Sequence, residues 1–265
     1  MHGSDASELL LSAHQPVYLP WLGLFHKLAV ADKFVIFDDV PYSKKMWYNR
    51  NKVLGPNGVI LLSVPVLYSK ADATKHKDVQ IDAASNWAFK HWRSIESAYR
   101  KSRYFNEYAG LLEGIYKQPW THLSALNEAM LRQFMVWLGI DTPLVHASAY
   151  EFRGEKSSLV LDMAQRLEAR AYLFGALGRD YADMGAFLSA GVAPLFQDYK
   201  HPIYPQNRGE EFVPYLSVLD LLFREGPASG DILRSGNPTR DDYLFEARNM
   251  LATFTRNRNA GAAAS

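Results

Sequence analysis

Polar residues able to do chemistry follow two short apolar runs near the start of the chain. His14 and Gln15 come directly after residues 9–13, and Asp38 and Asp39 come directly after residues 34–37. The loop that follows is dense in cationic, amide and aromatic side chains: Tyr42, Lys44, Lys45, Trp47, Asn49 and Arg50. Folding alone does not require so many polar and aromatic side chains at the ends of two strands. The first 50 residues therefore predict one wall of a binding site for a polar, anionic small molecule.

His14 is the first candidate catalytic residue of this segment. An imidazole with an ordinary pKa near 6.5 can act as a base, an acid or a hydrogen-bond donor to phosphate, although a structural histidine is the alternative. Asp38 and Asp39 are suited to orienting an amine or to binding Mg²⁺. Neighbours on an extended chain point to opposite faces, so we expect one carboxylate to face the site. Asp38 is our catalytic candidate and Asp39 a binding one.

The loop after Asp39 offers groups for an anion. Arg50 suits a bidentate grip on phosphate or carboxylate, and Lys44 and Lys45 add point charges. A solvated loop is the alternative for the two lysines, and Asn49 could shape a turn. A second polar cluster follows residues 193–197 and contains Gln197, His201, Tyr204 and Gln206.

His201 in this second cluster is either a catalytic residue or part of a rigid, proline-rich loop. Gly175 ends another apolar run, and a glycine there lets the backbone approach a ligand. The spacing around Gly175 matches neither a dinucleotide-binding fingerprint nor a P-loop. The histidines have no partner at metal-ligand spacing, so we predict no metal site.

Apolar runs of strand length alternate with helical patterns along most of the chain. The predicted strands are 9–13, 34–37, 59–67, 144–147, 171–174 and 193–197, and the predicted helices between them include 21–31, 156–168 and 180–190. This alternation predicts βαβ units, and hence an α/β protein with a mainly parallel, Rossmann-like sheet. Ligands of such sheets bind beyond the carboxyl ends of the strands. We therefore expect the ends of the first, second and sixth strands to converge.

Helical periodicity without an internal strand marks residues 86–138 as a helical insertion packed on the sheet. We predict a single α/β domain over 9–226 that includes this insertion. A C-terminal helical extension is predicted over 227–256, and a flexible tail over 257–265.

The bulk composition excludes several classes of function. Lys and Arg total 29 and Asp and Glu total 28, so no overall field favours nucleic acid or membrane. Cysteine is absent, which excludes disulfides and thiolate chemistry and favours a reducing compartment. No signal peptide or membrane-spanning stretch is present. We expect a cytoplasmic protein with a small-molecule substrate; the oligomeric state stays open.

The string HQPVYLPWLGLFHKLAVADKFVIFDDVPYSKK from residue 14 to 45 resembles the opening motif of the WbqC-like protein family. Further similarities are SVPV at 63–66, Leu126-Asn127, FQDYKHPIYPQ at 196–206 and LSVLDLLF at 216–223. The resemblance covers about 10–226. Pro41 and Phe174 depart from the family pattern at predicted ligand-facing ends. Within the opening motif we assign Tyr18 and Trp21 to substrate binding.

The resemblance implies a role in a surface-polysaccharide or specialised-metabolite pathway. Transfer of an aminoacyl group onto an amino sugar is among the activities suggested for the family. We therefore expect an amide-forming transferase or ligase, in which His14 deprotonates the amine and Asp38 holds it. A nucleotidyltransferase-like enzyme using ATP with Mg²⁺ is one alternative, and a non-catalytic binding protein is another.

The nucleotidyltransferase alternative has a partial basis in the layout of residues 14–32. This segment is similar to the first βα unit of HIGH-type nucleotidyltransferases. Trp21 and Leu24 stand where the two histidines of that motif align, so His14 would have to substitute for them. The sequence contains no motif that requires a cofactor. If a cofactor is used, ATP with Mg²⁺ is the candidate.

Overall fold

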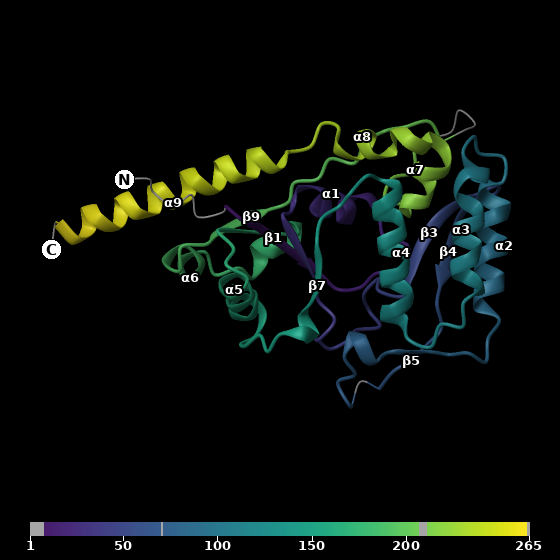
Figure 1. Ribbon diagram of the computed structural model, residues 1–265, viewed down its shortest axis with the longest axis horizontal. Helices are drawn as coiled ribbons and strands as arrows, with labels where there is room; N and C mark the ends of the chain where they lie inside the picture. The colour runs from purple at the N-terminus through teal and green to yellow at the C-terminus, as the bar shows by residue number, and fades with distance from the viewer. Residues whose placement is uncertain (1–7, 70, 207–210, 264–265) are drawn as a thin grey trace.

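Five parallel strands form the centre of the fold. The computed structural model describes residues 8–69, 71–206 and 211–263. The strands are β1 (Leu10–His14), β2 (Lys33–Ile36), β7 (Leu144–His146), β8 (Ala171–Phe174) and β9 (Ala193–Phe196). They lie in the order β7-β2-β1-β8-β9. β7 and β8 lie on opposite sides of β1, so the chain crosses over the sheet between them. This parallel sheet confirms the predicted Rossmann-like α/β fold (Figure 1).

Both faces of this sheet are covered by helices. On β1, Leu10 packs with Val30 of α1 (Leu22–Val30) and Leu244 of α9 (Arg240–Ala263). Leu11, the next residue, packs on the opposite face with α5 (Lys156–Arg166) and α6 (Met184–Ser189). Strands buried on both faces must be apolar throughout, which is why they appear in the sequence as short continuous apolar runs.

The long connection from β2 to β7 carries the helical insertion. It contains α2 (Trp87–Tyr99), α3 (Phe105–Lys117) and α4 (Leu123–Trp137). Two small antiparallel pairs precede them: β3 (Arg50–Gly55) with β4 (Gly58–Ser63), and β5 (Val66–Leu67) with β6 (Gln80–Ile81). In Figure 1, α2 and α3 lie at the end of the molecule opposite the C-terminus.

The predicted strand 59–67 does not join the parallel sheet. Its first half is β4, which pairs with β3 across a two-residue turn, and Gly58 after the turn has φ +116°. Val59 and Leu61 are 46% and 54% exposed. A two-residue connection favours local antiparallel pairing, and this outweighs the apolar character of the run.

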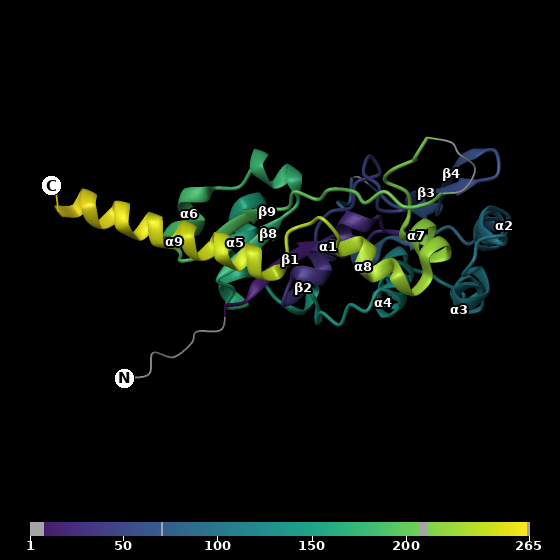
Figure 2. The ribbon, with the colours of Figure 1, turned by 90° about the horizontal axis from the view of Figure 1, so that it is seen from above.

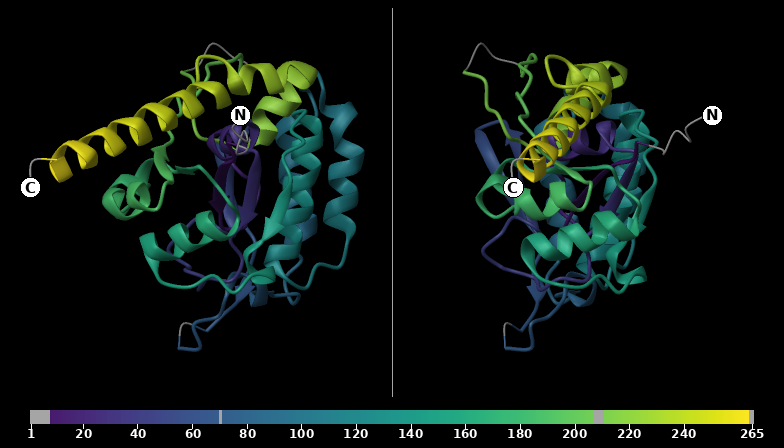
Figure 3. Two further views of the ribbon diagram at one scale, coloured as in Figure 1. Left: turned by 60° about the vertical axis from the view of Figure 1, so that its left-hand side comes forward. Right: turned by 90° about the vertical axis from the view of Figure 1, so that its left-hand side faces the viewer.

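Short 3₁₀ turns and three further helices complete the chain. The turns are η1 (His76–Asp78), η2 (Ala147–Ala149), η3 (Ala176–Asp180) and η4 (Gly226–Ala228). After α7 (Val218–Glu225) and α8 (Ser229–Arg234), helix α9 continues to Ala263, through most of the segment predicted as a flexible tail. Figures 2 and 3 show its second half extending past the sheet.

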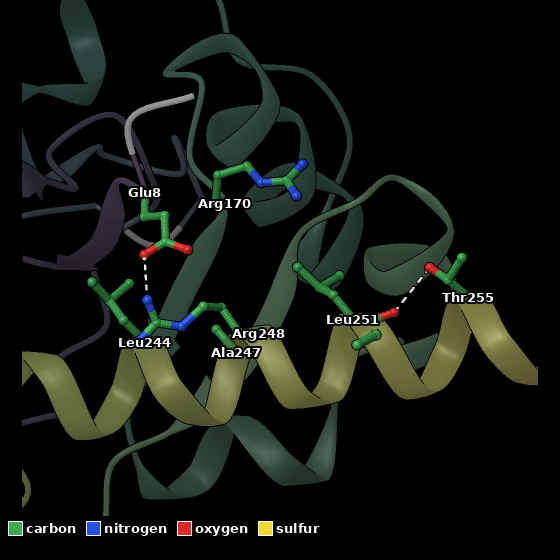
Figure 4. A pocket seen from close by; sticks show the side chains of 8 residues that line it. Glu8, Arg170, Leu244, Ala247, Arg248, Leu251 and Thr255 are labelled. Carbon is green, nitrogen blue, oxygen red and sulfur yellow. Dashed lines mark hydrogen bonds and ion pairs between the residues drawn. The ribbon is translucent and has the colours of Figure 1, made fainter. Parts of the chain in front are cut away.

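The first half of α9 is attached to the amino-terminal edge of the sheet. Arg248 lies 3.0 Å from Glu8, just before β1, and Leu244 and Ala247 are buried (Figure 4). The groove beside α9 is lined by Glu8 and Arg170, which precede β1 and β8. It therefore lies away from the carboxyl ends of the strands. No helix within 8–69, 71–206 or 211–263 combines the length and apolarity needed to cross a bilayer.

The insertion shares its core with the sheet domain through Phe134. This fully buried ring of α4 lies 6.2 Å from Phe25 of α1 and 5.6 Å from Trp137. We expect Phe134→Ala to lower the free energy of unfolding by about 3–5 kcal/mol, because a large cavity forms between α1 and α4. Urea denaturation followed by circular dichroism measures this change.

Val136→Ala provides the control on the same helix. Val136 is 72% exposed, so this change should cost less than about 0.5 kcal/mol. Equal effects of the two substitutions would contradict a shared core at Phe134.

Candidate functional site

A group of buried polar side chains lies beyond the carboxyl end of β1, on the side of α1 and α4. Strand order reverses beside β1, where ligands of doubly wound sheets bind. A small cavity here is lined by His14, Gln15, Asn127 and Glu128 together with apolar side chains. The last two residues belong to α4, so the insertion supplies one wall of the site.

His14 is a neutral imidazole with one free nitrogen. Its Nδ1 donates a hydrogen bond to the carbonyl oxygen of Gln15 at 2.8 Å, so the lone pair is on Nε2. Burial lowers the pKa of His14 to about 4, with nearby Lys27 and His76 lowering it further and the bond to Gln15 opposing them. At neutral pH, Nε2 is therefore a hydrogen-bond acceptor.

A second buried imidazole, His76, reaches the same region from η1. The backbone around it pairs with the chain leaving β2, through His76 N–H to Val40 O at 3.0 Å and Tyr42 N–H to Thr74 O at 2.8 Å. The ring of His76 lies 5.3 Å from Tyr42 and 4.3 Å from Tyr48. Burial lowers its pKa to about 4, so this ring is also neutral.

Several polar atoms around Tyr48 are buried without a hydrogen-bond partner in the described part of the chain. They are His76 Nε2, Tyr42 Oη, Asn49 Oδ1 and Asn127 Oδ1. Asn127 Nδ2 donates to Tyr48 O at 3.1 Å, and Asn49 Nδ2 donates to Val64 O at 2.7 Å. Since each amide nitrogen faces a carbonyl, the free atom of each amide is its oxygen, an acceptor.

Asp38 has no free oxygen and holds the site together. Its Oδ1 accepts from Ser148 N–H at 2.9 Å, and its Oδ2 accepts from Ser148 Oγ at 2.7 Å and lies 3.1 Å from His146 Nδ1. The other ring nitrogen of His146 lies 3.3 Å from Glu128 Oε1. Asp38 therefore ties the end of β2 to the residues after β7 and, through His146, to α4. This makes it a positioning residue.

Asp39 points to the opposite side of the chain. It pairs with Lys75 at 2.8 Å and Lys77 at 2.7 Å. Burial raises the pKa of Asp39, but hydrogen bonds and charge from the two lysines outweigh burial and hold it below its usual value. The two adjacent carboxylates thus bind different partners: Asp38 contacts Ser148 and His146, and Asp39 contacts the two lysines.

The basic loop after Asp39 is mostly exposed. Arg50 donates to the carbonyl oxygens of Lys44 and Lys45 at 3.4 and 3.3 Å, and its guanidinium lies 5.4 Å from the ring centre of Trp47. Lys44 Nζ lies 6.0 Å from the ring of Tyr68. These groups are available to a ligand that approaches from solvent.

The second polar cluster forms a separate group around His201. Its Nδ1 donates to Pro202 O at 2.8 Å, and its ring contacts Tyr204 and Tyr215. Burial lowers the pKa of His201. Tyr204 and Gln206 both donate to the buried carboxylate of Asp220 at 3.0 Å.

Trp21 joins this second group by packing edge-on against Tyr199 and Tyr215. Gln197 donates to Gly23 O at 2.8 Å and lies 3.1 Å from His26 Nδ1, which fastens the chain after β9 to α1. Within the described residues no hydrogen bond, ion pair or ring contact connects His201 with His14. The predicted residues therefore divide between two groups.

Two further predicted residues differ in their access to solvent. Tyr18 is fully buried, and its hydroxyl contacts His91 Nδ1 at 2.8 Å and Tyr116, so it belongs to the core of the insertion. Gly175 lies at the open carboxyl end of β8, where an added Cβ would meet no atom within 4 Å.

Sequence reasoning missed His76, Asn127, Glu128 and His146. Asn127 belongs to the Leu-Asn pair that carries part of the family resemblance, and His146 ends a predicted strand, so both had a usable signal. His76 lies in a segment without periodicity and had none. Among the residues the structure describes, no group of three His, Asp or Glu side chains could hold a metal ion.

The fold and this site define a doubly wound α/β protein with a buried polar pocket built from the sheet edge and a helical insertion. The chain belongs to the WbqC-like protein family, which it matches over residues 15–232. It is 35% identical over 222 residues to Rv1507c of Mycobacterium tuberculosis H37Rv, described as an uncharacterized protein. That match covers 83% of this chain and 95% of the relative. No solved structure matches the chain.

The different surroundings of Asp38 and Asp39 predict losses of stability of different size when each is replaced by alanine. Asp38 is 5% exposed, and Asp38→Ala leaves Ser148 and His146 without their acceptor, so we expect a loss of about 3 kcal/mol in unfolding free energy. Asp39→Ala removes two solvent-accessible ion pairs, with Lys75 and Lys77, and should cost about 0–1 kcal/mol. Chemical denaturation of both variants measures the difference, and equal losses would contradict this assignment.

The lowered pKa of His14 predicts acid sensitivity in a defined window. The unfolded chain, with an ordinary pKa near 6.5, binds more protons than the folded one below that pH. The unfolding free energy should therefore fall between about pH 6.5 and pH 4, and His14→Gln should reduce this fall by about 1–3 kcal/mol. An NMR titration of the His14 ring in the folded protein checks the cause; a midpoint near 6.5 would refute it.

Proposed function

We propose that this chain transfers an acyl or aminoacyl group onto an amine of an amino sugar or related small metabolite, forming an amide. The observation that carries the proposal is the chemical nature of the free atoms at the site. His14 Nε2 and the buried Asn127 Oδ1, which belong to residues lining the small cavity, and the buried Asn49 Oδ1 beside Tyr48 all accept hydrogen bonds. A ligand that satisfies buried acceptors must supply N–H or O–H donors, and an amine does so.

In this reaction the amine nitrogen attacks the carbonyl carbon of an activated acyl donor. A C–N bond forms, the bond between the acyl carbon and its leaving group breaks, and the leaving group departs with the bonding electrons. The attacking nitrogen becomes acidic as it bonds to carbon. His14 Nε2 takes its proton at that stage, which a weak, neutral base can do.

The remaining residues of the site have supporting roles. Asn127 Oδ1 accepts from the amine and orients its lone pair toward the donor. Asp38 holds the ends of β2 and β7 in place. Lys44, Lys45 and Arg50 lie on the exposed loop, where they would meet a phosphate or carboxylate of the donor or acceptor.

One observation weighs against the nucleotidyltransferase alternative. The ring of Trp21 lies over the start of α1, where a Cβ on Gly23 would be 2.1 Å from that ring. A phosphate therefore cannot come close to the backbone N–H groups at the start of α1, where helix N-termini bind anions.

We place the proposed reaction in the cytoplasm because the cysteine-free sequence favours a reducing compartment.

A mass-spectrometric assay tests the proposal. The full chain is incubated with nucleotide-linked amino sugars and either acyl donors or amino acids with ATP and Mg²⁺, and amide products are sought by their mass. We expect His14→Gln to lower the rate at least about 100-fold, as loss of a general base does. Binding of the amine substrate, measured by calorimetry, should change much less.

His201→Gln is the matched control, because this partly buried histidine also donates from Nδ1 to a neighbouring backbone carbonyl but lies in the separate group. It should keep activity within a few-fold of the unmodified chain. Calorimetry also separates enzyme from binding protein. Binding of an amino sugar without product formation under any of these conditions would favour the non-catalytic alternative, and equal affinity for the N-acetylated sugar would contradict recognition of the amine.

A further inference from the structure

A second cavity opens at the same edge of the sheet, on the opposite face from His14. It lies beyond β2 and β7 and encloses about 410 Å³, between Phe37 and Asp39 on one side and Tyr150, Phe152 and Leu159 on the other. This volume falls in the range of small-molecule sites, roughly 300–1,000 Å³. Side chains alternate along the chain that leaves β2, so Asp38 serves the His14 site and Asp39 faces this second cavity.

Two aromatic rings form one wall of the cavity. Tyr150 and Phe152 are two residues apart, and their rings are nearly parallel, with centroids 5.1 Å apart and an interplanar angle of 9°. Tyr150 remains 37% exposed. An exposed ring face beside an open cavity suits a flat ring that extends the stack.

Three charged side chains line this cavity: Asp39, Glu155 and Lys156. Together with the two lysines that pair with Asp39, they make three ammonium groups against two carboxylates. Asp39 is paired with both Lys75 and Lys77, so one carboxylate faces two ammonium groups. Lys156 also lines the cavity and has no ion pair or hydrogen bond with any described residue. Glu155 is the N-cap residue of α5, and its backbone carbonyl oxygen accepts from the N–H of Ser158 at 3.1 Å. An anionic group in the cavity would therefore meet Lys156 without displacing an existing partner.

We propose that this cavity binds a flat aromatic or heteroaromatic ring that carries an anionic group. The ring stacks on Tyr150, and the anionic group pairs with Lys156. A nucleotide and an aryl carboxylate share this chemistry. The site is independent of the amide-forming reaction proposed above, because it uses none of the residues around His14.

Titration of the full chain with three probes tests the proposal by calorimetry or ligand-observed NMR: adenosine 5′-monophosphate, adenosine and benzoate. We expect saturable binding of at least one of the two anionic probes. Tyr150→Ala should weaken it about tenfold or more, since stacking of a base on an aromatic side chain is lost. Lys156→Gln should weaken the anionic probes several-fold and leave adenosine unchanged.

Matched controls are Tyr181→Ala, which removes another half-exposed ring, and Lys90→Gln, which removes an exposed lysine of α2. Neither should alter binding, and His14→Gln should also leave it unchanged. Binding of the nucleotide alone would assign the site to nucleotides, and binding of benzoate alone to aryl carboxylates. If no probe binds saturably, or if Tyr150→Ala binds as well as the unmodified chain, the proposal is wrong.

Discussion

One buried carboxylate, that of Asp38, connects the segments from which the candidate site is built. A charge removed from water must be compensated by hydrogen bonds or by an opposite charge. Asp38 meets this requirement with the backbone and hydroxyl of Ser148 and with His146, which in turn contacts Glu128 of α4. The end of β2, the residues after β7 and a helix of the insertion are thereby fixed relative to one another. His14 and Asn127 keep their positions only within that frame.

The hydrogen bonds that each side chain of the site donates determine which of its atoms remains a free acceptor. In Asn49 and Asn127 the amide nitrogen donates to a backbone carbonyl, and the buried amide oxygen has no partner among the described residues. In His14, Nδ1 donates to a carbonyl in the same way, which leaves Nε2 as the acceptor. Each buried, unpaired polar atom costs about 1–3 kcal/mol. A ligand with matching donors recovers part of this free energy without reorienting the side chains, so these acceptors are preorganised for hydrogen-bond donors.

Much of the fold could be predicted because its signals are local. Strands buried on both faces are apolar throughout, and the helices between them show their own period, so the parallel sheet and the helical block follow from the sequence. His14 and Asp38 could be predicted as polar residues at strand ends. The antiparallel hairpin was missed because a two-residue turn outweighed an apolar run that resembles a sheet strand.

The rest of the site depends on tertiary pairing that no local pattern encodes. His76 reaches the site only because its backbone pairs with the chain after β2, and Asn127 only because α4 packs beside β1. Gln197 and Tyr18 have residue types suited to binding, but Gly23 and His91 occupy their polar groups. Residue type and position at a strand end identify candidates, whereas the partner of each polar atom decides its role.

Trp21 covers the start of α1, and positive charge at the carboxyl ends of the strands lies elsewhere. In doubly wound proteins an anion is commonly bound at the first helix N-terminus, but here Trp21 fills the space above Gly23. Cationic side chains lie instead on the segments that follow β2 and β7: Lys44, Lys45, Arg50, Lys75, Lys77 and Lys156. An anionic ligand at this edge would thus meet these cationic groups on the β2–β7 side of β1. His14 and Asn127 accept hydrogen bonds from a ligand on the other face of the sheet. The alternation of Asp38 and Asp39 separates these two surfaces, because each carboxylate organises the groups on its own face.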